Sequence, residues 1–446
     1  MKLRRIPSIR WLLACVLSGG CALALLFVLP TPDEAAVAAP AQAPLPDNAT
    51  LARGEYVAKA GDCAGCHTAA QGGAPLAGGL GLASPFGTIM SSNITPDRQF
   101  GIGQYSYEDF ARALREGVAR DGKRLYPAMP YASFAKISDD DMRALYGYVM
   151  HRVVPVAKPT PPSDVAFPFN QRWALRYWQL AFAPGGVYKP RADRDTQWNR
   201  GAYLVQSLGH CGACHTPRGA AFQERGYDES SKSYLTGSVN DHWFAPNLTG
   251  DKGSGLGRLN AADIASFLKT GHAGGVIAYG SMVEQIEDSS QYLTDEDAQA
   301  IARYLKSLPA QKPSGTYTPA ADPARASVNG NRVPDELSLG FNVYRSFCAR
   351  CHRDDGMGVP NAFPSLAGNP SVLTDDTTSL IRLLVEGGNS AATLTGPPRQ
   401  SMPGFVGTLA DVQIAQVLTY IRGAWGNNAQ PVTANDVSTL RSELHK

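Results

Sequence analysis

The chain has 446 residues, with 41 Lys and Arg against 39 Asp and Glu, so its formal net charge is only +2. Its length fits about three modules of ordinary size. The near balance of charges gives no electrostatic case for binding nucleic acid. With 45 Gly and 32 Pro the chain should be rich in loops.

Residues 1–45 are predicted to direct export. Lys2, Arg4 and Arg5 precede an apolar run, Trp11–Leu29, that Pro30 ends. This pattern is typical of a secretory signal, with small-residue cleavage sites around 36–38, but the run is long enough to remain as a membrane anchor. Both outcomes stay open. Either one places the body of the protein outside the cytoplasm.

The pentapeptide Cys-x-x-Cys-His occurs three times, which is the signature of covalent haem c attachment. Two thiols three positions apart can each add to a vinyl group of one porphyrin, and the histidine then lies under the iron. Zinc would need a fourth ligand for each trio, and a disulfide would not explain the repeated His. The sequence therefore predicts three haem c groups. The motif residues are Cys63, Cys66 and His67; Cys211, Cys214 and His215; Cys348, Cys351 and His352.

Repeated elements around the motifs predict a mainly α fold of three tandem class I cytochrome c-like domains joined by Pro-rich linkers. A Gly followed by an aromatic residue precedes each motif, and a helix should close each domain, starting at Ser138, Thr294 and Thr408. The predicted parts are the segment 1–45, domain 46–155, linker 156–195, domain 196–311, linker 312–332, domain 333–430 and a polar tail 431–446.

The first linker is rich in both Pro and aromatic residues, so we expect it to pack on the domains rather than to behave as a flexible tether. The second, by composition, should be an ordinary extended connector. Asn93-Ile94-Thr95 matches a glycosylation acceptor, but we interpret it as a loop beside the haem because the export and haem chemistry are bacterial.

A fast electron carrier needs a second axial ligand on each iron, and a thioether sulfur is the usual choice. Met129, Met282 and Met402 each precede the last helix of a domain, beside Pro or Gly, in what we predict to be loops. Met142 has helical spacing and is predicted to pack in the core. Met90 and Met357 remain weaker alternatives.

A carbonyl acceptor should fix each proximal imidazole through its second ring nitrogen. The sequence suggests the Pro364 carbonyl for His352 and the Pro75 carbonyl for His67, with no candidate for His215. The remaining histidines (His151, His210, His242, His272 and His445) are expected at the surface or at helix ends.

The order of these motifs, with Tyr126-Pro127-Ala128-Met129-Pro130-Tyr131 and Cys214-His215-Thr216-Pro217-Arg218, resembles the triple-haem cytochrome c subunit of bacterial membrane-bound dehydrogenases. Members serve alcohol, gluconate, fructose and sorbitol dehydrogenases. The resemblance, from about residue 50 to about 430, implies a flavin- or quinone-dependent catalytic subunit as partner, optionally a small third subunit, and ubiquinone as acceptor at the inner membrane. One departure is that no apolar anchor follows the last domain.

Three alternatives stay open. The cytochrome could serve a molybdenum hydroxylase that oxidises aldehydes or N-heterocycles, or feed a terminal oxidase. It could also be a peroxidase-type multihaem enzyme, which would need one vacant iron position. The chain itself shows no nucleotide fingerprint and no catalytic triad, so we expect no substrate catalysis without a partner.

Overall fold

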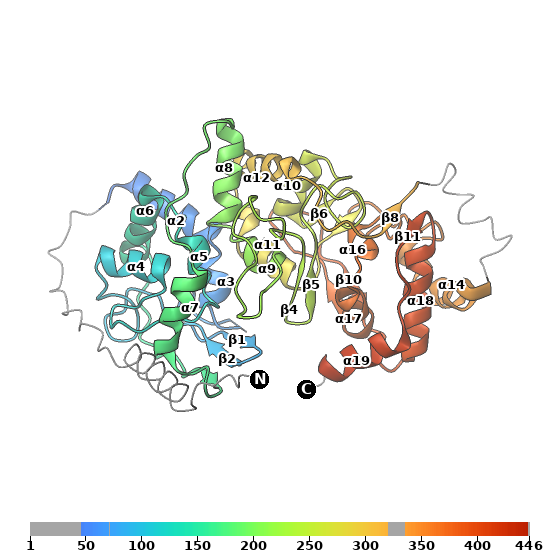
Figure 1. Ribbon diagram of the computed structural model, residues 1–446, viewed down its shortest axis with the longest axis horizontal. Coiled ribbons are helices and arrows are strands. Elements are labelled where there is room, and N and C mark those ends of the chain that lie inside the picture. Colours follow the sequence, from blue (N-terminus) through green and yellow to red (C-terminus); the bar gives the residue numbers. More distant parts are fainter. Residues whose placement is uncertain (1–45, 71, 320–334, 445–446) are drawn as a thin grey trace, which may run out of the picture. The chain divides into compact units, whose positions relative to one another are not determined.

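The computed structural model describes residues 46–70, 72–319 and 335–444, all within one compact unit, Ala41–Lys446. The export segment 1–45 and most of the second linker lie outside the described residues. Figure 1 shows a mainly helical chain with short strands between the helices. We refer to 46–155, 196–311 and 335–444 as the first, second and third segments.

The first segment starts and ends with a helix of 13 residues, and these two helices pack on each other. Gly54 permits the close approach, since a Cβ there would lie 2.0 Å from the Ala144 carbonyl oxygen. Ser138 caps the closing helix through the Asp141 N–H, as predicted. The elements are α2 (Asn48–Ala60), α3 (Cys63–His67), β1 (Gly81–Ser84), β2 (Gly87–Met90), α4 (Tyr107–Glu116), α5 (Tyr131–Phe134) and α6 (Asp139–His151).

The first linker carries secondary structure of its own. Its short strand extends the β1–β2 hairpin in the order β1-β2-β3, and a helix follows. The prediction that this stretch packs on its neighbours is confirmed for strand β3 and for Trp178, which donates to the Ala221 carbonyl. Four of its aromatic side chains are exposed instead: Phe167, Phe169, Trp173 and Tyr177. Its elements are β3 (Asp164–Val165), a 3₁₀ turn (Arg172–Ala174) and α7 (Leu175–Phe182).

The second segment repeats the plan of the first. Thr294 caps its closing helix, as predicted, and Gly201 lies against the Ala300 carbonyl as Gly54 does against that of Ala144. The elements are α8 (Thr196–Gln206), α9 (Gly212–His215), β4 (Ser238–Asn240), β5 (Trp243–Ala245), α10 (Ala261–Thr270), β6 (His272–Ala273), β7 (Val276–Ile277), α11 (Ser281–Asp288), a 3₁₀ turn (Ser290–Tyr292) and α12 (Asp295–Ser307).

The third segment pairs α14 with α18 in the same way. The start predicted for α18 at Thr408 is wrong: the helix begins after Ala410, whose N–H donates to the Gln413 side chain. The tail predicted to be merely polar forms α19, which buries Val437 and Leu440. The elements are α14 (Asp335–Phe347), α15 (Ala349–His352), α16 (Pro370–Leu373), α17 (Thr378–Glu386), β9 (Gly387–Asn389), β10 (Ser401–Pro403), α18 (Asp411–Gly423), β11 (Asn427–Asn428) and α19 (Ala434–Leu444). Strand β8 (Thr316–Tyr317), in the described part of the second linker, pairs with β11.

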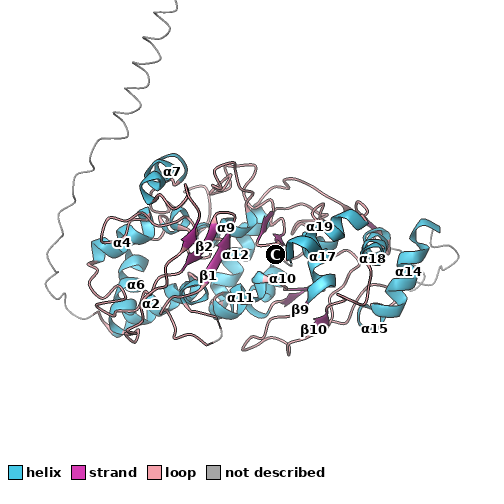
Figure 2. Cartoon of the chain, turned by 90° about the horizontal axis from the view of Figure 1, so that it is seen from below, coloured by secondary structure: helices cyan, strands magenta, loops and turns pink. Residues whose placement is uncertain are grey.

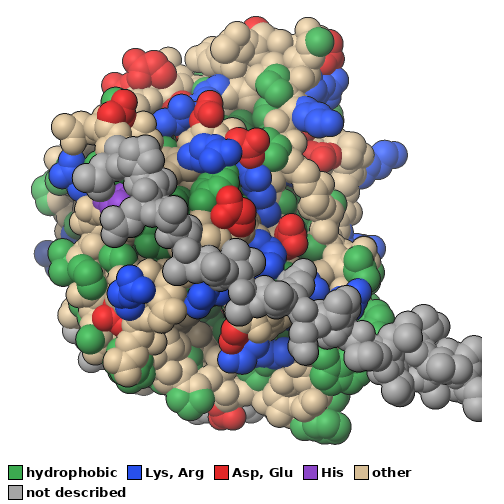
Figure 3. Space-filling view, turned by 90° about the vertical axis from the view of Figure 1, so that its left-hand side faces the viewer, with side chains coloured by type: hydrophobic (Ala, Val, Ile, Leu, Met, Phe, Trp, Pro, Cys, Tyr) green, Lys and Arg blue, Asp and Glu red, His purple; other side chains and the backbone are tan. Residues whose placement is uncertain are grey.

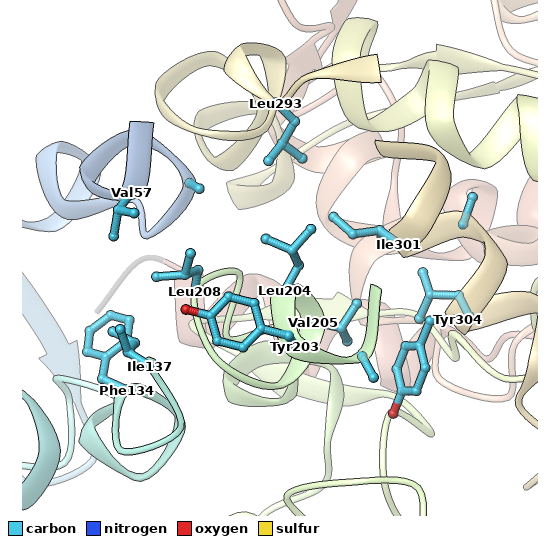
Figure 4. Packing of buried hydrophobic residues seen from close by; sticks show 14 of the residues in the cluster. Val57, Phe134, Ile137, Tyr203, Leu204, Val205, Leu208, Leu293, Ile301 and Tyr304 are labelled. Carbon is cyan, nitrogen blue, oxygen red and sulfur yellow. The ribbon is translucent and has the colours of Figure 1, made fainter. Parts of the chain in front are cut away.

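The buried apolar side chains form one core shared by the first two segments and a separate core in the third. In Figure 4, Val57, Phe134 and Ile137 of the first segment lie around Leu208 and Tyr203 of the second. A small third cluster, Ala278, Ile286 and Ala391, joins the second segment to the third. The first two segments are thus packed as one body.

Two reciprocal hydrogen bonds close the interface between the first two segments. Tyr56 donates to Asp297 across it at 2.5 Å, and Tyr203 donates to Asp141 in the opposite direction at 2.6 Å. Each acceptor is also held by an arginine of its own segment, Arg53 on Asp141 and Arg200 on Asp297. Because these residues occupy matching positions in the two repeats, the interface has the reciprocal pattern of a two-fold pair.

The mixture of basic and acidic side chains on the surface is consistent with the low net charge. On the face in Figure 3, Lys and Arg side chains are interspersed with Asp and Glu side chains. Among the described residues, no helix has both the length and the apolar character required to cross a membrane.

Candidate haem sites

The three Cys-x-x-Cys-His motifs form short helices that follow the first helix of each segment. A left-handed residue makes the sharp turn into the first two, Asp62 at φ 51° and His210 at φ 34°. All six motif cysteines are free thiols, partly buried except Cys214, which is exposed. Burial is the main cause that raises the pKa of Cys63 to about 12, so the thiol stays protonated at neutral pH. Each motif thus offers an unbridged pair of thiols.

Each motif histidine is held by a backbone carbonyl. The Nδ1 atoms lie 2.7 Å from the Ser92 oxygen for His67, 2.7 Å from Pro246 for His215 and 3.0 Å from Pro364 for His352. Burial lowers the pKa of all three imidazoles, which are therefore neutral at pH 7. A neutral ring that donates from Nδ1 keeps the Nε2 lone pair for a metal.

The predicted acceptor for His352, Pro364, is confirmed, whereas Pro75 is wrong for His67. The residue that accepts is Ser92, because the turn at Leu76 and Gly78 (φ 61° and 66°) lets the Gly78 N–H bond the His67 carbonyl and brings the following loop to the ring. Pro246 holds the matching position in the second segment. Both acceptors directly precede an Asn-x-Thr sequence, and this shared signal could have located them.

The two Asn-x-Thr loops hold the acceptors in place. Asn93 is buried, and its amide donates to the carbonyls of Val156 and Lys158 at 2.8 and 3.0 Å. Asn247 donates in the same way to Gln311 at 2.8 Å. The structural interpretation of Asn93 as a loop beside the motif is confirmed, since its amide is already used within the fold. Each loop thereby ties its histidine acceptor to the chain that leaves the closing helix.

The candidate methionines have three different settings. Met129 lies in a loop, where its N–H donates to the Tyr126 carbonyl, and packs against the shared core. The loop prediction is wrong for Met402, which lies in β10 opposite Gly388, and for Met282, which lies in the first turn of α11. Met402 packs on the third core and Met282 on the small cluster around Ile286.

Met142, Met357 and His272 differ from the candidate ligands in burial or in position along the chain. Met142 is fully buried in α6, as expected of a packing residue. Met357 is 42% exposed, five residues from His352. His272 follows the end of α10, in line with its expected place at the surface or at a helix end, but it is only 4% exposed and its Nδ1 meets the Thr270 carbonyl. Sequence spacing could not show that burial.

Electrostatic coupling links the first two motifs. Burial raises the pKa of Cys66 to about 11. Two nearby groups raise it further by smaller amounts: Asp62, which directly precedes the first motif, and Cys214, which belongs to the second motif. Helix α11, which carries Met282, also contacts α3 of the first motif. The first two motifs therefore lie near each other.

The donor set fits haem c at each site: two free thiols at the required spacing, an oriented neutral imidazole and a thioether in the same segment. The cysteines would form the thioether bonds to the porphyrin, and His67, His215 and His352 would bind iron through Nε2. Haem supplies a one-electron couple when bound.

Comparisons with known proteins agree with this chemistry. The cytochrome c family model matches residues 199–309 and 337–425, and the model of cytochrome c oxidase, cbb3-type, subunit III matches residues 49–149. The gluconate 2-dehydrogenase cytochrome c subunit of Pantoea cypripedii is 46% identical over 404 residues, which cover 89% of this chain and 90% of the relative.

Two further relatives extend the comparison. The cytochrome c subunit of the quinone alcohol dehydrogenase of Gluconacetobacter polyoxogenes is 46% identical over 408 residues, 90% of this chain and 86% of the relative. A nicotinate dehydrogenase subunit of Pseudomonas putida is 42% identical over 383 residues, which cover 84% of this chain but 30% of that protein. The chain belongs to the family of cytochrome c subunits of dehydrogenases such as the gluconate and quinone-dependent alcohol dehydrogenases.

Proposed function

We propose that this chain carries three covalently bound haem c groups and transfers electrons from a dehydrogenase catalytic subunit to ubiquinone at the periplasmic face of the inner membrane. The observation that carries the proposal is the threefold recurrence of a free Cys pair beside an imidazole fixed through Nδ1. The proposed iron ligand pairs are His67 with Met129, His215 with Met282 and His352 with Met402. The three sites belong to tandem domains over 46–155, 196–311 and 333–430.

The partner is a flavin- or quinone-dependent subunit that oxidises CH–OH groups of alcohols, sugars or sugar acids. The names of the gluconate and alcohol dehydrogenase relatives support this choice. Such an oxidation removes two electrons, whereas a haem accepts one, so the substrate step belongs to the partner. The residues of this chain fix the haems, exclude water around them through the buried cores and keep their ligands in place.

A deletion strain tests the proposal. Membranes without this chain should still oxidise the partner's substrate with an artificial dye but should lose substrate-driven oxygen uptake. Restoring the gene should restore uptake. Unchanged respiration in the deletion strain would contradict the proposed role, and so would substrate turnover by the purified cytochrome without a partner.

A second candidate donor is a molybdenum hydroxylase that oxidises an N-heterocycle. The similarity to the nicotinate dehydrogenase subunit over most of this chain favours it. The two candidates differ in the substrate that drives respiration in the wild type and fails to do so in the deletion strain. Purifying the dehydrogenase that accompanies this cytochrome would distinguish them directly.

A further inference from the structure

Helix α7 lies at an outer edge of the described chain and is fixed by one face (Figure 2). On that inner face Gln179 is 7% exposed and donates to the Gly117 carbonyl of the first segment at 3.1 Å. Trp178 donates from its indole nitrogen to the Ala221 carbonyl of the second segment at 2.7 Å. The helix is therefore held against both segments, and its other face is presented outward in a fixed orientation.

Large apolar side chains at helical spacing lie on the outward face of α7 and on the 3₁₀ turn (Arg172–Ala174) that leads into it. Trp173 is 56% exposed, Tyr177 48% and Leu180 77%, and the rings of Trp173 and Tyr177 contact each other at a centroid distance of 6.4 Å. Positions i, i+4 and i+7 lie along one stripe of a helix. An outward apolar stripe on a helix that already buries its other face needs an explanation beyond folding.

Aromatic residues from three parts of the chain extend the stripe. Phe169, 50% exposed, contacts Phe86 of the β1–β2 turn at 4.2 Å, and Phe86 contacts Phe222 at 4.9 Å. Phe167 is 78% exposed and Phe222 42%. We call this surface the aromatic patch; it consists of Phe167, Phe169, Trp173, Tyr177, Leu180 and Phe222.

The linker stretch that carries most of the aromatic patch has an excess of positive charge, although Asp164, three residues before Phe167, is exposed as well. Between Asp164 and Asp193 the sequence contains Arg172, Arg176 and Lys189 together with Arg191, and no Asp or Glu. Arg176 is exposed and lies between Trp173 and Leu180 on the outward face. Arg191 is already paired with Asp193 at 2.7 Å, which leaves Arg176 and Lys189 as the other exposed cations of this stretch.

We propose that the aromatic patch docks on a membrane surface that contains anionic phospholipids. Trp and Tyr side chains prefer the headgroup level, Leu and Phe enter the acyl boundary, and Arg and Lys pair with anionic headgroups. The patch combines all three kinds of side chain on α7 and on the chain that precedes it. The excess of cations in this stretch favours an anionic lipid surface over a protein partner, whose interface would select aromatic residues without requiring an excess of one charge. This contact would hold the cytochrome beside the membrane whichever dehydrogenase supplies the electrons.

The test uses the purified, haem-loaded full chain and vesicles of phosphatidylethanolamine and phosphatidylglycerol that contain a photoactivatable phospholipid. After illumination, mass spectrometry should find lipid adducts on residues 167–182 and far fewer with pure phosphatidylcholine vesicles. This readout is local, so any binding through the N-terminal segment does not obscure it. Vesicle binding without adducts in 167–182 would overturn the proposal, and so would equal labelling by both kinds of vesicle.

Variants sharpen the result. The double change Trp173→Glu and Leu180→Glu should reduce labelling of this peptide by roughly tenfold, because it replaces apolar side chains with anions at the membrane. Leu394→Glu is the matched control, since Leu394 is an equally exposed leucine (81%) outside the patch. Unchanged haem absorbance shows that each variant is folded. The double variant could also keep its lipid labelling but no longer copurify with the dehydrogenase. That result would show that the patch is a protein interface and that the proposal is wrong.

Discussion

The ligands of each proposed iron differ in how firmly the fold holds them. Each histidine is fixed by a carbonyl within 3.0 Å. The methionines depend on local backbone: Met402 lies in a paired strand and Met282 in the first turn of a helix. Thioether ligation raises a haem potential, because sulfur donates less charge to iron than imidazole does.

Replacing Met402 by His should lower the potential of one haem. Imidazole stabilises the oxidised iron, and we expect a fall on the order of 100 mV for that haem alone. Redox titration of the purified cytochrome measures it. The control is Met142→Leu in the core, which should leave all potentials in place and cost less than about 1.5 kcal/mol of stability. A wild-type titration curve for the Met402 variant would mean that another residue is the ligand.

At the residue scale, sequence predicts chemistry that is local and misses contacts that depend on a loop path. Pro364 lies 12 residues after His352 and is predicted from the sequence. Ser92 and Pro246 lie 25 and 31 residues from their histidines, beyond turns in which Leu76 and Leu235 adopt positive φ. Non-glycine residues seldom adopt that conformation, so their sequence gives little warning of the turn.

At the scale of elements, helix starts follow from capping chemistry where the cap is a hydroxyl side chain. Ser138 and Thr294 can be predicted because each accepts from the N–H three residues later. Thr408 imitates this pattern, but the cap position falls on Ala410, where the Gln413 side chain provides the hydrogen bond. Periodicity also gives no sign of the reciprocal tyrosine bonds, because each partner lies in a different repeat.

The carboxylate of Asp297 should stabilise the pairing of the first two segments. Burial tends to raise its pKa, but the hydrogen bonds from Arg200 and Tyr56 outweigh burial and leave the pKa below the ordinary value of 3.8. A lowered pKa means that the stabilisation is fully present above about pH 4 and is lost as the pH falls through the folded value. Asp297→Asn should therefore cost about 1–3 kcal/mol at pH 7.

Denaturant unfolding followed by haem absorbance at several pH values measures this effect. The loss should shrink toward zero only as the pH falls through the lowered pKa of the folded carboxylate, which lies below 3.8, because the wild-type group then becomes protonated as well. Glu55→Gln is the control, because the pair of Glu55 with Lys59 is exposed and should contribute less than about 0.5 kcal/mol. An equal loss at all pH values would show that the carboxylate charge plays no part.

At the scale of the whole molecule, the three segments do not each have a core of their own. The first two segments share one buried core and a reciprocal interface, whereas the third has its own. The sequence predicts three similar repeats but cannot show that two of them pack as one body. The apolar pattern of the sequence around Leu208 is the same whether this side chain packs within its own repeat or against another repeat.

This arrangement predicts how the loss of one haem spreads through the molecule. Wild type should contain three haems per chain, and replacing both Cys348 and Cys351 by Ser should leave two. The third core should then unfold at a lower temperature, while the unfolding temperature of the first two segments should stay the same because they bury their apolar side chains against each other.

Replacing Cys63 and Cys66 by Ser should also leave two haems. This change should lower the unfolding temperature that the first and second segments share, since Val57, Phe134 and Leu208 pack in one core. Haem-to-protein ratios and differential scanning calorimetry on the three proteins measure both quantities. A wild-type ratio of one or two would contradict the haem count, and equal shifts of both transitions in either variant would contradict the division into two cores.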